Sequence, residues 1–374
     1  MEAKRIILMY ISAVSGHRSA AIAIEKAIKL LSPDTQILSI NAFNYTNPIS
    51  ERIINRLYMG VVEKAPAIWD YLYDNPQVAK RIEKLKKAVH RFNSPKLKKL
   101  FDEFRPDVVA CTQAFPCGMV ADFKKIYNSR IPLVAVLTDY IPHSYWIYDT
   151  VDFYITPSDE VTGRLVSRGI SGEKIKTLGI PFSPSFNQPI DKKSVLQKLG
   201  LGENIPTILI MGGSHGLGPI KTIIGSLEKT AQEIQEIIVA GANRRLYRSL
   251  ARQIKKYKKK IALLGFVDNI NELMSVSDII LTKPGGITVA EALGKKLPML
   301  IIKPLPGQEA SNTAYLTEKK AALKIDDLNR INLIIDDLLL DRDKLSVLRE
   351  ASGQISKPFA SRDIAELLLS LNNV

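Results

Sequence analysis

Glycine-rich turns that follow apolar stretches are the places where this chain holds residues able to do chemistry. The segment Lys283–Glu291, KPGGITVAE, follows such a stretch and opens a predicted helix. Gly285 and Gly286 let backbone N–H groups approach a ligand, and a helix N-terminus favours an anion. Thr288 and Glu291 face one side of the first helical turns, where a carboxylate can accept hydrogen bonds from both hydroxyls of a ribose. An ordinary strand–turn–helix with a capping glutamate is the alternative.

A second polar turn lies in Pro304–Asn312, PLPGQEASN, after the next apolar stretch. It places Gln308, Glu309 and Asn312 at the start of a predicted helix. Adjacent amide and carboxylate groups suit the recognition of sugar hydroxyls. The alternative interpretation is a helix start with a good cap.

A third glycine-rich loop, Met211–Pro219, has the sequence MGGSHGLGP. Its composition, with Gly212, Gly213 and Ser214 at the start, indicates a phosphate-binding loop. The loop lacks the Gly-Lys-Ser/Thr ending of a P-loop. It also lacks a regular G-x-G-x-x-G pattern with an acidic residue about 20 positions later, which argues against NAD. A tight turn between a strand and a helix is the alternative.

Two further segments supply candidate bases. His17 follows the first apolar stretch in the sequence SGHR, and a histidine can remove a proton from an attacking hydroxyl near neutral pH. Asp139 and His143 lie in TDYIPHSYW, which begins where another apolar stretch ends and which closes on Trp146. A structural histidine and a polar turn with an aromatic anchor are the alternatives at these two places.

The elements that must position these residues alternate between strand and helix, which favours parallel sheets. Strands are predicted at 5–12, 35–40, 107–112, 132–138, 152–156, 174–178, 207–211, 237–240, 261–264, 279–282 and 299–302. The proline-rich segment Gly179–Pro189 is interpreted as a linker. We expect an α/β protein of the GT-B architecture, in which two Rossmann-like domains with parallel sheets face each other across a cleft. The domains are expected at 1–185 and 186–355, with a terminal helix over 356–374 that can cross back to the first domain.

Charge points to an anionic partner, either nucleic acid or anionic lipid, because the 374 residues carry a formal net charge of +14. Two cysteines and no secretory signal favour a cytoplasmic protein, and no apolar run approaches the ~20 residues of a membrane-spanning helix. Basic residues concentrate in 80–105, whose apolar spacing fits an amphipathic helix, and in Lys255–Lys260. A helix packed on the core and a solvated helix face are the alternatives. No nucleic-acid-binding signature accompanies the charge.

Together these segments resemble the monogalactosyldiacylglycerol synthase and processive diacylglycerol glucosyltransferase group, in glycosyltransferase family 28. They are also similar to the related peptidoglycan transferase that adds N-acetylglucosamine to lipid I. Ser12–Ala21 resembles the N-terminal glycine–histidine signature of the group, although its loop is poorer in glycine. Tyr58–Asp74 resembles the acceptor segment, and GGSHG, KPGG-x-T-x-x-E and PGQE-x-x-N resemble the donor domain.

The resemblance implies roles for the matching positions. Glu291 would hold the UDP ribose, while Ser214 and the turn at Gly285 and Gly286 would hold the diphosphate. Gln308 and Glu309 would bind the hexose and recognise its hydroxyls. His17 would act at the catalytic centre, with Asp139 as the rival base. The remaining expected contacts are Phe266 and Val267 with uracil, Gly212, Gly213, Thr288 and Asn312 with the donor, and Tyr58, Trp69, Tyr71, His143 and Trp146 with the acceptor or membrane.

The expected reaction is an inverting transfer of glucose or galactose from UDP-glucose or UDP-galactose to diacylglycerol. We expect no cofactor and no required metal, because the only D-x-D pattern, Asp341-Arg-Asp343, lies far from the glycine loops. Anionic membrane lipids are expected partners, nucleic acid is not, and the protein is expected at the inner face of the cell membrane without spanning it. The alternatives are a polyprenyl acceptor such as lipid I, a UDP-sugar epimerase, and a non-catalytic UDP-sugar sensor.

Overall fold

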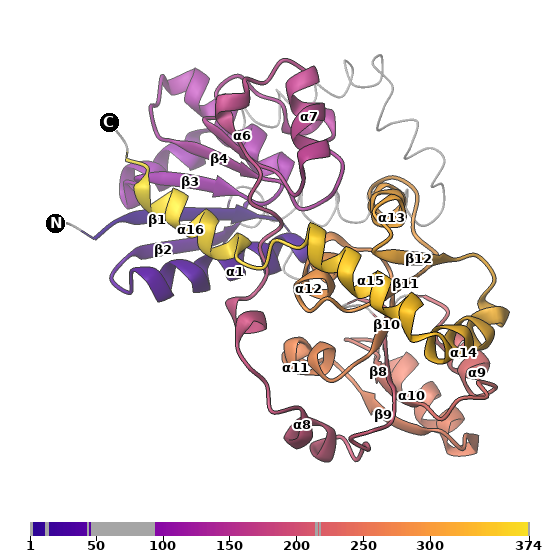
Figure 1. Ribbon diagram of the computed structural model, residues 1–374. Coiled ribbons are helices and arrows are strands. Elements are labelled where there is room, and N and C mark those ends of the chain that lie inside the picture. The colour runs from indigo at the N-terminus through magenta and orange to yellow at the C-terminus, as the bar shows by residue number, and fades with distance from the viewer. Residues whose placement is uncertain are drawn as a thin grey trace. The chain divides into compact units, whose positions relative to one another are not determined.

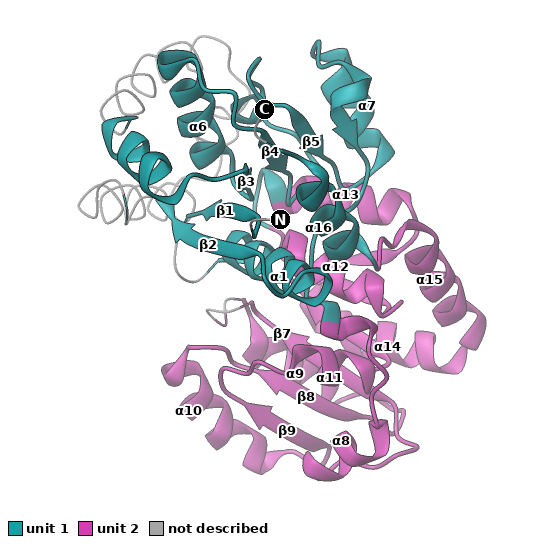
Figure 2. Cartoon of the chain, turned by 90° about the vertical axis from the view of Figure 1, so that its left-hand side faces the viewer, with its two compact units in different colours: residues 1–184, 305–308, 359–374 teal, residues 185–304, 309–358 magenta. Residues whose placement is uncertain are grey.

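The computed structural model describes residues 3–11, 15–42, 45, 94–213, 216 and 218–372. The chain forms two compact units (Figure 2). Unit 1 comprises 1–184, 305–308 and 359–374, and unit 2 comprises 185–304 and 309–358. Each unit is described by itself below.

Unit 1 contains a parallel sheet in the order β2-β1-β3-β4-β5-β6 (Figure 1). Its strands are β1 (Arg5–Tyr10), β2 (Gln36–Asn41), β3 (Val108–Cys111), β4 (Leu133–Val136), β5 (Phe153–Ile155) and β6 (Ile175–Lys176). The central strands β3 and β4 are uniformly apolar and fully buried, as expected for strands covered by helices on both faces. All six strands that the apolar stretches of this half predict are therefore confirmed.

Helices cover both faces of this sheet. They are α1 (Gly16–Leu31), α6 (Ala114–Tyr127), α7 (Asp159–Ser167) and α16 (Ala360–Ser370), with a further helix over 94–104 and short 3₁₀ turns η1 (Ser144–Trp146) and η2 (Gly172–Lys174). Because side chains alternate along a strand, Ile6 and Leu8 of β1 pack with α1 and α16, whereas Ile7 and Met9 pack with α6. Lys4 fastens the end of α16, since its Nζ donates to the carbonyls of Leu369, at 2.6 Å, and Leu371.

Unit 2 contains a second parallel sheet in the order β12-β11-β10-β7-β8-β9. Its strands are β7 (Thr207–Met211), β8 (Gln235–Val239), β9 (Lys260–Leu264), β10 (Ile279–Thr282), β11 (Met299–Ile302) and β12 (Ala322–Ile325). Five of them are predicted from the sequence. Strand β12 is not, because it is a short edge strand of four residues in which Lys324 interrupts the apolar run.

In unit 2, α8 (Lys192–Lys198) precedes the first strand, and the other helices lie between and after the strands. These are α9 (Ile220–Leu227), α10 (Arg244–Gln253), α11 (Ile270–Ser275), α12 (Gly286–Gly294), α13 (Gln308–Glu318), α14 (Ile331–Leu340) and α15 (Arg342–Ile355). Short 3₁₀ turns occur at η3 (Pro184–Asn187), η4 (Ile254–Lys256) and η5 (Leu328–Arg330). Within the described residues, none of the helices combines the length and the apolar composition that crossing a membrane requires.

Glu236 is an unusual residue of this fold because its side chain is fully buried within β8. Neither carboxyl oxygen has a hydrogen-bond partner among the described residues. Burial raises the pKa of Glu236 from 4.5 to about 8, with nearby Glu228 adding to the rise and Lys259 opposing it. Between these two pH values the native state holds a proton that the unfolded state has released, so stability falls as the pH rises.

We expect Glu236→Gln to remove this pH-dependent loss. From pH 5 to pH 9 the free energy of unfolding of the variant should rise by up to about 4 kcal/mol relative to the wild type. Urea unfolding at the two pH values measures the difference. Glu233→Gln, on the exposed turn before β8, is the matched control and should follow the wild-type profile. A Glu236→Gln profile parallel to that of the wild type would contradict the expectation.

Candidate active site

The polar and glycine-rich segments of the sequence follow the carboxyl ends of strands in both sheets. In unit 1 they follow β1, β3 and β4, which are neighbours in the sheet. In unit 2 they follow β7 and β10, which pair with Met211 opposite Thr282, and also β9 and β11. Since all strands in a sheet are parallel, these segments lie along one edge, where ligands bind in open α/β sheets.

In unit 1, His17 is held by residues from two neighbouring strands. It lies in the first turn of α1, whose N-cap Ser15 accepts a hydrogen bond from the backbone of Arg18. The His17 Nδ1 atom is 2.9 Å from the carbonyl oxygen of Thr112 and 3.1 Å from the hydroxyl of Thr138. The Thr112 hydroxyl donates in return to the His17 carbonyl at 2.8 Å. These reciprocal bonds fix the imidazole relative to β3 and β4.

The hydrogen bonds also determine which ring nitrogen of His17 carries the proton. A carbonyl oxygen can only accept, so Nδ1 donates to Thr112 and the neutral ring leaves Nε2 unprotonated. Nε2 has no hydrogen-bond partner among the described residues. Burial lowers the pKa of His17 from 6.5 to about 4, and the bond to Thr112 opposes this shift. The imidazole is therefore neutral at pH 7, with a lone pair available to take a proton.

The other candidate residues of unit 1 lie after β4. Asp139, the second candidate base, is partly buried and directly follows Thr138. Because the Thr138 hydroxyl contacts His17, the segments that hold the two candidate bases lie next to each other. His143 precedes η1, and its ring is 5.6 Å from that of Tyr145. Trp146 is only 4% exposed and belongs to the core of unit 1. Its side chain therefore packs inside this unit and offers almost no surface to an acceptor.

In unit 2, the glycine loop after β7 has backbone conformations that other residues rarely adopt. Gly213, Gly216 and Gly218 all have positive φ, and the Gly216 N–H donates to the Gly213 carbonyl at 3.0 Å. A Cβ atom at Gly216 would overlap the carbonyl oxygen of Ala240, at the end of β8. The close approach of the loop to β8 thus depends on glycine at this position.

Gly216→Ala is expected to destabilise unit 2 by at least about 2 kcal/mol, because it adds a clash to an unfavourable φ of +57°. UDP affinity should fall with it, since the loop must move away from Ala240. Thermal unfolding and calorimetric UDP titration measure the two effects. The control is Gly163→Ala, in α7, where a Cβ meets nothing within 4 Å and should be neutral or slightly stabilising. Unchanged stability of Gly216→Ala would contradict the expectation.

The turn after β10 ends in an open helix N-terminus. Gly285 is the N-cap of α12 and provides no side-chain cap. Among the described residues, the N–H groups of Gly286, Ile287 and Thr288 have no acceptor, and no Cβ-sized obstacle lies within 4 Å of Gly285. Three open donors and the positive end of the helix dipole form a site for an anionic group such as a phosphate.

Glu291 lies one turn further along α12, on the same side as Thr288. Its carboxyl is partly buried and makes no hydrogen bond within the described residues. Burial raises the pKa of Glu291 from 4.5 to about 8. A partly buried carboxyl without a partner is costly, and it becomes favourable when a ligand supplies hydroxyl donors.

The start of α13 is fastened to the turn after β10 by two neighbouring contacts. Lys283 Nζ lies 3.5 Å from Glu309 Oε2, and both side chains are partly buried. Asn312, which is fully buried, donates from Nδ2 to the Pro284 carbonyl at 2.9 Å. Asn312 therefore positions the backbone, and Lys283 is a site residue that the sequence analysis does not single out. Its place between the end of β10 and the Pro284-Gly285-Gly286 turn is the signal that could have found it.

The remaining candidate residues fall into three groups. Phe266 and Val267 follow β9, and the Phe266 side chain is 67% exposed. Gln308 begins α13 and is partly buried. Ser214, Tyr58, Trp69 and Tyr71 lie outside the described residues, as does most of the basic segment 80–105.

Asp341, in the D-x-D pattern, serves as a helix cap. Its Oδ1 accepts from the backbone N–H groups of Asp343 and Lys344 at the start of α15. Within the described ranges, no three or more His, Cys, Asp or Glu side chains gather as a metal site would require.

Two family models match this chain, one over each half of the sequence. The family model described as monogalactosyldiacylglycerol (MGDG) synthase matches residues 17–182. The model described as glycosyltransferase family 28 C-terminal domain matches residues 207–368. The first match includes His17, Thr112 and Thr138, and the second includes the glycine loop and Glu291.

Relatives of similar length carry the same name. A processive diacylglycerol beta-glucosyltransferase of Bacillus cereus is 30% identical over 361 residues, which cover 96% of this chain and 92% of the relative. The protein of that name from Bacillus pumilus is 29% identical over 365 residues, covering 97% and 94%.

Solved structures share the fold at lower identity. MurG of Acinetobacter baumannii matches with a TM-score of 0.66 at 15% identity, covering 98% of this chain and all of that one. The UDP-GlcNAc 2-epimerase of Neisseria meningitidis matches with a TM-score of 0.64 at 14% identity, covering 98% and 99%. The predicted GT-B fold, with two Rossmann-like units, is thereby confirmed.

Proposed function

Because this chain belongs to the glycosyltransferase family of the MGDG synthases and processive diacylglycerol glucosyltransferases, we propose that it transfers a hexose from a UDP-sugar to diacylglycerol. The observation that carries the donor assignment is the pairing of open N–H groups at α12 with the unpartnered Glu291. The N–H groups suit the diphosphate and the carboxyl suits the ribose hydroxyls. Glu309, oriented by Lys283, is then the proposed reader of the hexose.

The donor that we propose is UDP-glucose. Relatives whose matches cover nearly the whole chain are named beta-glucosyltransferases, which supports glucose over galactose. UDP-glucose has an α-linked sugar, so a β-linked product requires inversion at the anomeric carbon. A single displacement by the diacylglycerol hydroxyl has this outcome.

In the proposed mechanism, His17 Nε2 accepts the proton of the diacylglycerol hydroxyl as its oxygen attacks the anomeric carbon. Thr112 and Thr138 hold the ring in the required tautomer. The bond to UDP breaks as the new bond forms, and negative charge develops on the diphosphate. The open N–H groups of Gly286, Ile287 and Thr288 stabilise this charge, so the step is proposed to need no metal ion.

The acceptor lies in a bilayer, so we propose that the protein works at the membrane surface, on its cytoplasmic face. The segment Tyr58–Asp74, which resembles the acceptor segment of the group, is the proposed contact with the diacylglycerol.

The proposal is tested by a transfer assay on vesicles that contain diacylglycerol. Purified protein receives UDP-glucose or UDP-galactose in separate reactions, each with and without EDTA, and the lipid product is extracted and identified. We expect a β-glucosyl lipid, equal yields with and without EDTA, and little product from UDP-galactose. Loss of product in EDTA that Mg²⁺ restores would contradict metal independence. No product from either donor, with tight UDP binding, would contradict diacylglycerol as acceptor, and a polyprenyl acceptor would then be tested.

A further inference from the structure

The segment from Ile237 to Val267 in unit 2 is unusual because it contains no acidic residue. It includes nine basic residues, which are Arg244, Arg245, Arg248, Arg252, Lys255, Lys256, Lys258, Lys259 and Lys260. They lie on α10, on η4, on the turn that follows η4 and on the first residue of β9. Eight of them are exposed, and we call these eight the α10 basic surface. The ninth, Lys259, folds inward and donates to the carbonyls of Thr230 and Gln232.

The apolar side of α10 is already packed. Leu250 is fully buried, and Leu246 and Ile254, at four-residue spacing from it, pack against the same core of unit 2. The opposite side carries Arg245, Arg248 and Arg252, which share one face at helical spacing. The helix therefore presents charge outward and keeps no apolar face for insertion into a membrane.

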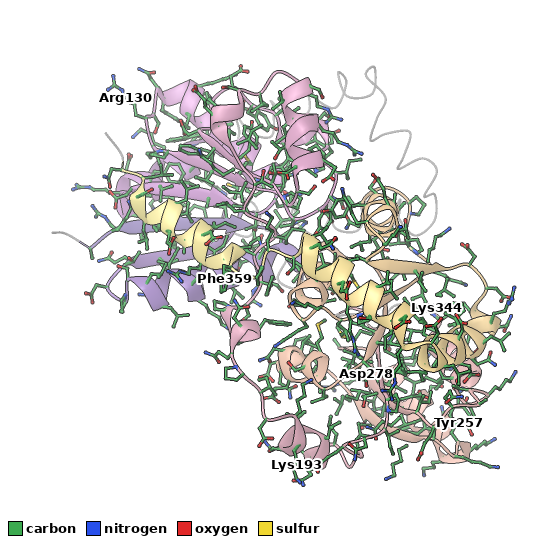
Figure 3. All side chains as sticks on the ribbon, in the orientation of Figure 1. Arg130, Lys193, Tyr257, Asp278, Lys344 and Phe359 are labelled. Atoms are coloured by element: carbon green, nitrogen blue, oxygen red, sulfur yellow. The ribbon has the colours of Figure 1, made fainter. Side chains whose placement is uncertain are left out.

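The α10 basic surface has little charge compensation: one carboxylate, that of Glu228, lies at its edge and accepts from the backbone N–H groups of Lys258 and Lys259. None of its eight cations forms an ion pair with any described residue. Elsewhere in unit 2 such pairs exist, as between Lys344 and Asp337 at 2.6 Å or between Arg349 and Asp278 at 3.1 Å (Lys344 and Asp278 are labelled in Figure 3). Like charges at three- and four-residue spacing destabilise a helix, and protein surfaces normally mix both signs. Such a surface is best explained by an external anionic partner.

The position of α10 links this surface to the donor site of the same unit. The helix follows the carboxyl end of β8 after a four-residue turn, 240–243, and its N-cap is Asn243. A Cβ at Gly216, in the glycine loop, would come 3.2 Å from the Cβ of Asn243. The helix lies on the outside of unit 2 beside β8 and β9 (Figure 2). An anionic surface bound by α10 would therefore lie next to the edge that binds the donor.

We propose that the α10 basic surface binds the anionic phospholipid headgroups of the bilayer that holds the acceptor. Binding is electrostatic and does not insert the helix, because the apolar side of α10 is occupied. The choice of a bilayer over other polyanions rests on the proposed function, whose acceptor is a membrane lipid.

The test compares two triple variants with equal loss of charge. One is Arg245→Gln/Arg248→Gln/Arg252→Gln, and the other removes exposed cations elsewhere, Lys26→Gln/Lys198→Gln/Lys357→Gln. Sedimentation with phosphatidylcholine vesicles that contain phosphatidylglycerol measures partitioning at several salt concentrations. Each cation near such a surface contributes about fivefold, so the first variant should partition about 100-fold more weakly and with a shallower salt dependence. The second should lose less than about fivefold.

Equal losses in the two variants, or undiminished binding by the first, would overturn the proposal. So would α10-dependent binding to a single-stranded oligonucleotide together with no binding to the vesicles. Glucosyl transfer in neutral detergent micelles serves as a separate readout, and the first variant should retain it. If the wild type transfers no sugar but binds vesicles through α10, the result supports membrane binding by the α10 basic surface and contradicts the proposed transferase function.

Discussion

Replacing His17 with alanine is expected to lower kcat for hexose transfer by about 10²–10⁴-fold while leaving the affinity for UDP nearly unchanged. The imidazole is neutral, because burial lowers its pKa to about 4, and its Nδ1 proton is committed to the Thr112 carbonyl. The unprotonated Nε2 is therefore the atom that takes the proton of the acceptor hydroxyl. Steady-state rates at saturating UDP-glucose, with UDP affinity measured by calorimetry, check both parts of the expectation.

His17→Asn separates the chemical role from a structural one. The asparagine Nδ2 atom can donate to Thr112 in place of Nδ1, so the link between α1 and β3 can persist, but no base remains. We expect this variant to be as slow as His17→Ala and as stable as the wild type. An active His17→Asn would assign proton transfer to another group, and Asp139 would be the next residue to replace.

The pH profile is a second readout of the same assignment. With a pKa of about 4, His17 stays unprotonated from pH 5.5 upward. At saturating donor, kcat should therefore show no acid limb near pH 6.5, where an unperturbed histidine titrates. A limb at that pH that disappears in His17→Asn would show that the ring is protonated more easily in the working enzyme.

Glu291→Ala is expected to weaken UDP binding by about 10²–10³-fold, because it removes two hydrogen bonds from ribose hydroxyls to a charged acceptor. The position of Glu291 one turn beyond the open N–H groups of α12 is the basis of this expectation. Comparison with 2′-deoxy-UDP makes the test specific. The wild type should bind UDP more tightly than 2′-deoxy-UDP, and Glu291→Ala should bind both about equally. The control Glu233→Ala, at an exposed position of unit 2, should change neither affinity.

Proton linkage provides an independent check on Glu291. Its pKa is raised to about 8 in the free protein, so the carboxyl is mostly protonated at pH 7. Hydroxyl donors favour the carboxylate, so UDP binding should release a proton, and affinity should rise from pH 6 to pH 8 and then level off. Calorimetry in two buffers of different ionisation enthalpy measures the release. Release of the same size in Glu291→Gln would trace the proton to another group.

The sequence by itself determined the elements and the motifs at their ends. Eleven strands of the described sheets coincide with predicted apolar stretches, since a buried parallel strand is a local apolar run bounded by turn residues. The segment from Lys283 to Glu291 indicated an anion site next to a ribose-binding carboxyl, because helical spacing alone places Thr288 and Glu291 on one face. Family membership likewise followed from residues that are close together in the chain.

The tertiary structure alone decided which of these segments meet. The pairing of β7 with β10, which brings the glycine loop beside the turn of α12, depends on strand order, and no local pattern encodes strand order. The contacts of His17 with Thr112 and Thr138 join residues about a hundred positions apart. The burial of Trp146 and the pairing of Lys283 with Glu309 have the same origin. Periodicity along the chain reports what a residue faces, whereas packing between distant segments decides which side chain it touches.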